Sequence, residues 1–128
     1  MTERLYRSMR KGRGEKPEVG RSARMLGIRP GIDILVESDG TVGGGAGGMS
    51  VAPDSPANLP RHRRPPEHGG TGKDPVWEID IAELEEALAY REDPLQRGVH
   101  GFVEPRGTMT LEDYESALAA TREAWRLL

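Results

Sequence analysis

The stretch from Pro53 to Pro75 is too rich in proline and glycine to form a helix or a strand. Proline fixes φ and removes a backbone donor, and no hydrophobic stripe of either period runs through the stretch. The sequence therefore predicts a long loop over residues 53–75, with the basic run Arg61–Arg64 at its centre. Loops of this length in a small domain are usually functional or disordered. The ordered elements must come from the residues on either side of it.

Composition limits the size and number of those elements. The chain has 128 residues, which suits a single domain over residues 1–128, but only 35% are hydrophobic and 27 are glycine or proline (17 and 10). The absence of cysteine excludes disulfides, thiolate nucleophiles and cysteine-based zinc sites, and is compatible with a reducing cytoplasm. No apolar run has membrane-spanning length, and no secretory signal is present. We expect a soluble, cytoplasmic protein with no membrane partner.

Hydrophobic periodicity predicts a mixture of strands and helices. Alternation or β-branched runs predict strands at Leu5–Met9, Ile32–Val36, Val76–Ile79 and Val99–Pro105. Asp39-Gly40 supplies the chemistry of a reversal after the second of these, and Thr41-Val42 begins a returning strand.

Two helices are predicted in the second half of the chain. Asp80 lies three residues before Glu83 in an arrangement close to a capping box, Ile81, Leu84 and Leu88 follow at helical spacing, and Pro94 ends the segment. The second helix opens at Thr110 and carries Leu111, Tyr114, Leu118, Thr121 and Trp125 along one side, to pack across a sheet. The predicted fold class is α+β.

Two features suggest a binding site in the first half of the chain. Arg7 shares the apolar side of its strand with Leu5 and Met9, so its guanidinium either meets an anion or lies on an exposed edge. The glycine run at 43–48 leads into Ser50-Val51, and is either an anion-binding loop whose amides line a pocket or a flexible linker.

The late strand carries further candidates. His100, Phe102 and Glu104 share one of its faces, where a histidine and a carboxylate can act together. His62 and His68 lack metal-ligand spacing, so no metal site is predicted.

Charge is unevenly distributed along the chain. The net charge is −3, yet residues 1–30 and 61–64 are basic, whereas residues 78–86 and 112–123 are acid-rich. The basic segments can contact nucleic acid or the phosphates of a dinucleotide, or they are solvated surface.

Three short motifs together resemble a known family. They are Leu5-Tyr6-Arg7, the Asp39-Gly40 turn leading to Gly47-Gly48-x-Ser50-Val51, and His100-x-x-Val103-x-Pro105-x-x-x-Met109 running into a helix with Trp125. In this combination the chain, from residue 5 to its end, resembles the small bacterial type VI secretion effector toxins with an ADP-ribosyltransferase-like fold. Met49 stands where that family's pair of hydroxyl residues would place a threonine.

The resemblance implies a compact split antiparallel sheet with flanking helices that grips NAD in a cleft. It implies catalytic roles for Arg7, Ser50 and His100, with Glu104 as the late acidic group of the wider superfamily. It implies NAD binding by Tyr6, Arg7, Gly48 and Ser50. The implied activity is that of a toxin in the cytoplasm of a target cell. Its implied partners are NAD, a target macromolecule and a cognate immunity protein or antitoxin.

A second function, from a different class, also fits the residues. A non-enzymatic module on the same fold would contact nucleic acid or another protein, with Arg61–Arg64 and the basic N-terminal region as its contact surface. Binding to nucleic acid would weaken steeply with salt.

Overall fold

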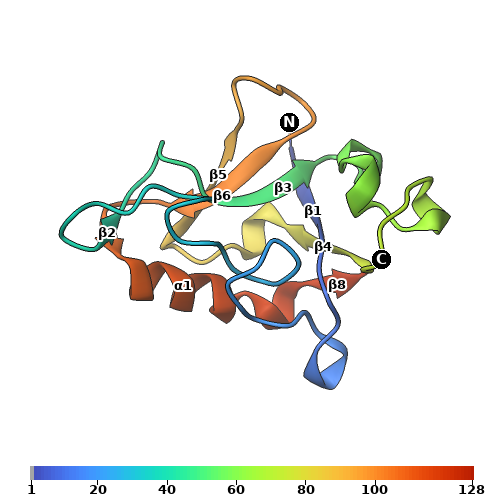
Figure 1. Ribbon diagram of the computed structural model, residues 1–128, viewed down its shortest axis with the longest axis horizontal. Coiled ribbons are helices and arrows are strands. Elements are labelled where there is room, and N and C mark those ends of the chain that lie inside the picture. The colour runs from blue at the N-terminus through green and yellow to red at the C-terminus, as the bar shows by residue number, and fades with distance from the viewer. Residues whose placement is uncertain (1) are drawn as a thin grey trace.

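An antiparallel sheet of six strands organises the chain, and the computed structural model describes residues 2–128 (Figure 1). The strand order is β5-β6-β3-β1-β4-β8, and β2 and β7 form a separate two-stranded ladder. The strands are β1 (Arg4–Ser8), β2 (Thr41–Val42), β3 (Met49–Pro53), β4 (Val76–Asp80), β5 (Leu88–Glu92), β6 (Gly101–Pro105), β7 (Met109–Thr110) and β8 (Arg126–Leu127).

The helix α1 (Leu111–Ala120) runs along one side of this sheet (Figure 1). The Thr110 side chain caps it by accepting a hydrogen bond from the Asp113 N–H at 3.1 Å, as the sequence predicted. Its buried residues, Tyr114 and Leu118, pack into the main core beside Trp77 and Trp125. The α+β class is therefore confirmed, with α1 as the one α-helix among the described residues.

The six-stranded sheet is divided between β1 and β3. These strands pair at only two positions, Leu5 with Pro53 and Tyr6 with Ala52. Beyond them, β1 continues its pairing with β4 alone, and β3 pairs with β6 alone. Because the two strands separate after a short shared stretch, Arg7 and Ser50 lie at the edges of a gap in the sheet.

Tyr114 fixes the start of β3 against β6. Its buried hydroxyl donates to the Val103 carbonyl at 2.5 Å and accepts from the Met49 N–H at 3.1 Å. Burial raises the pKa of Tyr114, so the hydroxyl keeps its proton and remains a donor at physiological pH. The backbone immediately before Ser50 is thus held by the helix as well as by the ladder.

The predicted strand over Ile32–Val36 is wrong. Arg29 and Asp33 close a tight turn there: the Asp33 carboxylate accepts from the Arg29 N–H at 2.7 Å and from its guanidinium at 2.8 Å. Gly31 adopts φ +77° within the turn, and only Ile34 is buried, whereas Ile32 and Leu35 are exposed. The Pro-Gly pair that starts the turn outweighs the β-branched residues after it.

The predicted helix after Asp80 is also wrong. Residues Ile81–Glu83 form a single 3₁₀ turn, and Leu88–Glu92 is strand β5. Leu88 pairs with Pro105 and Tyr90 with Val103, so these residues satisfy the outer edge of β6. Tertiary pairing overrides the helix propensity of the Ala, Leu and Glu residues in the segment.

The last helix is shorter than predicted. It ends at Ala120, a 3₁₀ turn covers Arg122–Ala124, and the chain then adds β8 to the edge of β4. Trp125 is buried as expected, but it lies beyond the helix and donates its indole N–H to the Thr121 hydroxyl at 3.0 Å.

The prediction of a loop after β3 is confirmed, although the loop is not featureless. Between β3 and β4 it contains 3₁₀ turns at Pro56–Asn58, Arg61–Arg63 and Pro66–His68. The N–H of Thr71 donates to the Arg61 carbonyl at 3.0 Å and that of Gly72 to the Arg64 carbonyl at 2.7 Å. These contacts fold the loop back on itself around its arginines.

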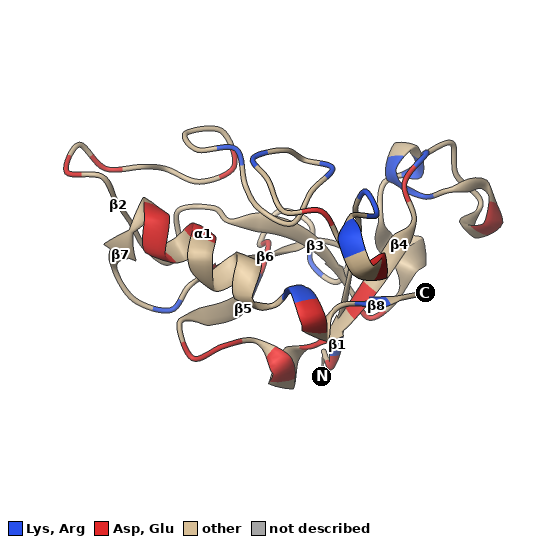
Figure 2. Cartoon of the chain, turned by 90° about the horizontal axis from the view of Figure 1, so that it is seen from below, with Lys and Arg blue, Asp and Glu red and all other residues tan. Residues whose placement is uncertain are grey.

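Several basic residues of the N-terminal region form ion pairs with carboxylates, and Figure 2 shows where basic and acidic residues lie along the chain. Arg4 pairs with Asp80, Arg21 with Glu115 and Arg24 with Asp74. Much of the basic N-terminal region is therefore neutralised by the acidic segments it packs against. No helix within residues 2–128 is long and apolar enough to cross a membrane.

Candidate functional site

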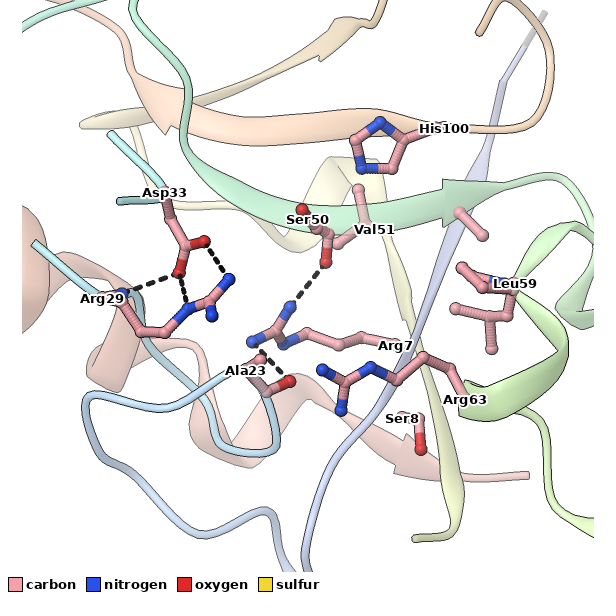
Figure 3. Close-up of a pocket in the computed structure, with 12 residues that line it drawn as sticks. Arg7, Ser8, Ala23, Arg29, Asp33, Ser50, Val51, Leu59, Arg63 and His100 are labelled. Carbon is pink, nitrogen blue, oxygen red and sulfur yellow. Dashed lines mark hydrogen bonds and ion pairs between the residues drawn. The ribbon is translucent and has the colours of Figure 1, made fainter. Parts of the chain in front are cut away.

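A pocket of about 170 Å³ lies at the gap between β1 and β3 (Figure 3). Arg7, Ser50 and His100, which are far apart in the sequence, all line it. Arg29, Asp33 and Arg63 contribute the remaining charged side chains. The pocket therefore carries three arginines against one carboxylate.

Arg7 is buried, and backbone carbonyls surround its guanidinium. It donates to the carbonyl of Ser50 at 2.7 Å and to that of Met25 at 2.9 Å. Longer bonds, of 3.3 to 3.4 Å, reach the carbonyls of Ser22, Ala23 and Gly27. Arg7 thus connects the strands on both sides of the gap to the loop over residues 22–27.

No carboxylate within residues 2–128 forms an ion pair with Arg7. Burial, together with the nearby charge of Arg63, lowers the pKa of Arg7 to about 10. The group still carries its proton at pH 7, so the site holds a desolvated cation whose charge is not neutralised. A bound anion would relieve that cost.

His100 forms a pair with Asp93, a residue that the sequence did not single out. The His100 Nδ1 lies 2.8 Å from the Asp93 carboxylate, and the Asp93 N–H donates to the His100 carbonyl at 3.0 Å. The pKa of Asp93 is lowered mainly by its hydrogen bond with His100 and, to a smaller extent, by the hydrogen bond it accepts from the Leu95 N–H. Since an ionised carboxylate only accepts, Nδ1 carries the ring proton, and Nε2 of a neutral His100 is left as a base.

Ser50 is exposed at the pocket, on the strand that enters the sheet after the glycine run. Gly48, two residues earlier, lies against β6: a Cβ at this position would come within 2.7 Å of the Val103 carbonyl. Its φ of +153° also favours glycine. Gly48 is outside the residues that line the pocket, and its observed contacts serve the close approach of two backbones.

Glu104 also lies away from the pocket. One of its buried carboxylate oxygens is 2.6 Å from Arg91 Nε, and the other accepts from the Gly45 N–H at 2.8 Å. The predicted shared face is present, since His100 packs edge-on against Phe102 at 4.9 Å between ring centroids. Glu104, however, uses one oxygen to hold the glycine run and the other to pair with Arg91.

Tyr6 lies behind the pocket. It belongs to a small apolar cluster with Ala52, Leu59 and Val76, of which Leu59 and Ala52 reach the pocket wall. Of the six residues predicted for the site, the structure therefore brings three together in one pocket: Arg7, Ser50 and His100.

Sequence reasoning missed Asp93, Arg63 and the Arg29–Asp33 pair. Asp93 lies seven residues before His100, across a loop that no local pattern links to it. Arg63 belongs to a basic run interpreted only as a whole. A turn signal at Pro30-Gly31 was the one available indication that Asp33 leaves its predicted strand.

Among residues 2–128 no group of three histidine, aspartate or glutamate side chains is placed to hold a metal ion. No protein-family model, curated protein or solved structure matches the chain.

Proposed function

We propose that this protein is a bacterial toxin with an ADP-ribosyltransferase-like fold, which uses NAD as substrate in the cytoplasm of the cell it attacks. The observation that carries the proposal is the meeting of Arg7, Ser50 and His100 in one pocket at the gap between β1 and β3. The three motifs of the resemblance contribute one residue each. The gap in the sheet agrees with the split antiparallel sheet that the resemblance implies.

The two sides of the pocket suit two different parts of NAD, its pyrophosphate and its nicotinamide ribose. Arginines pair well with phosphate oxygens, and Arg63 and Arg29 supply guanidinium groups at the pocket wall. Ser50 and His100 line the opposite side as Figure 3 is drawn. We therefore place the pyrophosphate toward the arginines and the nicotinamide ribose toward Ser50 and His100.

The reaction breaks the bond between the nicotinamide nitrogen and the ribose C1′. Nicotinamide leaves with the bonding electron pair, and an acceptor hydroxyl or amine forms the new bond to C1′. The acceptor's proton passes to Nε2 of His100, while Asp93 holds the ring through Nδ1 and stabilises the imidazolium that forms. In this scheme Glu104 acts indirectly, because it positions the glycine run that precedes Ser50.

A toxin of this kind requires protection of the cell that makes it. The proposed partner is a cognate immunity protein that covers the pocket. A pull-down with the His100→Ala variant as bait is expected to recover the product of a neighbouring gene, and recovery of none would count against this partner.

Growth of a bacterial host tests the proposed function. Wild-type protein expressed from a tightly controlled promoter is expected to arrest growth, and His100→Ala is expected to restore it at equal soluble expression. His68→Ala is the matched control, because His68 lies in the 53–75 loop and does not line this pocket. A harmless wild-type protein would overturn the proposal.

A further inference from the structure

A second pocket, of about 270 Å³, adjoins the first. The two pockets share Ser8 and Arg63, so they are neighbours that meet at Arg63; we refer to them as the first and second compartments and to Arg63 as their junction. His62 and Lys73 contribute further basic side chains to the second compartment, as does Arg24. This compartment lies over the 53–75 loop, from which the proposed reaction has so far used only Arg63.

The loop holds the backbone of its arginine-rich turn in a fixed conformation. Gly70 and Gly72 pack directly on the backbone of the Arg61–Arg64 turn, and a Cβ on Gly72 would come within 2.8 Å of the His62 carbonyl. The hydrogen bonds from Thr71 and Gly72 described above close the same turn. These contacts fix the backbone from which the Arg63 side chain extends. Figure 3 shows this side chain alongside that of Arg7.

Positive charge in the second compartment is only partly compensated. Arg24 is neutralised by Asp74 through two bonds of 2.7 and 2.9 Å. Within residues 2–128, neither Arg63 nor Lys73 forms an ion pair with a carboxylate. At the junction, Arg63 also faces the buried cation of Arg7, which shares the first pocket with it. Two guanidinium groups that face one space without an ion pair favour a ligand with more than one negative charge.

The volumes of the two compartments also favour a ligand that occupies both. Pockets that enclose a small-molecule ligand usually measure roughly 300–1,000 Å³. The first compartment, at about 170 Å³, and the second, at about 270 Å³, each fall below that range, whereas together they lie within it. A ligand as long as a dinucleotide is therefore too large for either compartment alone and fits the combined volume of the two.

We propose that the two compartments form a single site for a nucleoside diphosphate, with the diphosphate at the junction on Arg63 and Lys73 and the nucleoside in the second compartment. The identification of the ligand as NAD rests on the proposed function, but the diphosphate site itself follows from the charges and the shared wall. Arg63 is then the group that binds phosphate. The guanidinium of Arg7 is hydrogen-bonded to backbone carbonyls, so Arg7 attracts the diphosphate through its positive charge and does not contact it.

The test compares the binding of ADP and of inorganic pyrophosphate by calorimetry at fixed salt. Arg63→Gln is expected to weaken both by roughly tenfold or more, as the loss of a charge-assisted hydrogen bond does. Arg61→Gln is the matched control: it removes the same charge two residues away, from a side chain that lines neither compartment. It is expected to change affinity less than about twofold.

Three results of these binding measurements would overturn the inference. Equal binding by wild type and Arg63→Gln removes Arg63 from the site, and equal weakening by Arg61→Gln and Arg63→Gln reduces the effect to general attraction. Tighter binding of a single-stranded oligonucleotide than of ADP, with the same dependence on Arg63, would replace the nucleotide by nucleic acid.

These outcomes are separable from the fate of the proposed function. If ADP binds through Arg63 but wild-type protein leaves NAD intact and cells unharmed, the diphosphate site stands and the toxin proposal fails. If NAD is cleaved at the wild-type rate and affinity by Arg63→Gln, the toxin proposal stands and the site at the junction fails.

Discussion

Replacing His100 with alanine is expected to slow nicotinamide release from NAD by roughly 10²–10⁴-fold, the usual contribution of a general base. The reason is that Nε2 of His100 is the proposed acceptor of the proton, and the bond from Nδ1 to Asp93 at 2.8 Å leaves it in the right tautomer. The measurement is nicotinamide release by purified protein, with bacterial extract as the source of acceptors.

Two further variants make this prediction specific: Asp93→Asn, which changes the partner of His100, and the control His68→Ala, which lies outside the pocket and should keep the wild-type rate. Asparagine preserves the shape of Asp93 but not its charge, so the rate should fall less than in His100→Ala and its pH profile should shift. Hydrogen bonds from His100 and from the Leu95 N–H lower the pKa of Asp93 below its ordinary value, so its carboxylate is ionised and holds the histidine at the neutral pH of the assay. An unchanged rate in folded His100→Ala protein would remove His100 from the mechanism.

Replacing Arg7 with methionine is expected to destabilise the fold by about 3 kcal/mol or more, because buried carbonyls lose their donors at about 1–3 kcal/mol each. The shortest bonds lost are those to Ser50 and Met25, at 2.7 and 2.9 Å. Arg10→Met is the control, since Arg10 forms only a half-exposed pair with Glu18 and should change stability by less than about 1 kcal/mol. Urea denaturation at pH 7 measures both.

The outcome for Arg7 decides how activity data are interpreted. If Arg7→Met unfolds at lower urea than wild type, loss of toxicity in an Arg7 variant reports on folding as well as on NAD, and His100→Ala is the cleaner probe. A variant as stable as wild type would instead make Arg7 a ligand-binding side chain whose bonds to the carbonyls are dispensable.

Local patterns predicted the elements on which the pocket depends. The alternation around Arg7 corresponds to β1 and the strand entry at Ser50 to β3. The strand predicted over Val99–Pro105 corresponds to β6, which begins at Gly101, so His100 lies just before it. The Thr110 cap was recognised because capping chemistry is confined to four residues. Each of these signals lies within a short stretch of chain.

The errors arose where distant residues decide the structure. Leu88–Glu92 has a helical composition but is a strand, because β6 offers an unpaired edge. Glu104 contacts Arg91 on the neighbouring strand and Gly45 in the glycine run. No rule of sequence spacing connects these three residues. Asp93 and Arg63 were missed for the same reason, since only the folded chain shows what they face.

Titration of the protein with NAD, followed by the backbone amide resonances in NMR spectra, tests whether this pocket binds NAD. We expect saturable shifts at Ser50, Val51 and His100, which line the first compartment, and at Arg63 at the junction. The same titration of folded Arg63→Gln should require a higher concentration of NAD. Absence of shifts at millimolar NAD, or shifts confined to residues outside both compartments, would contradict the claim that this pocket binds NAD.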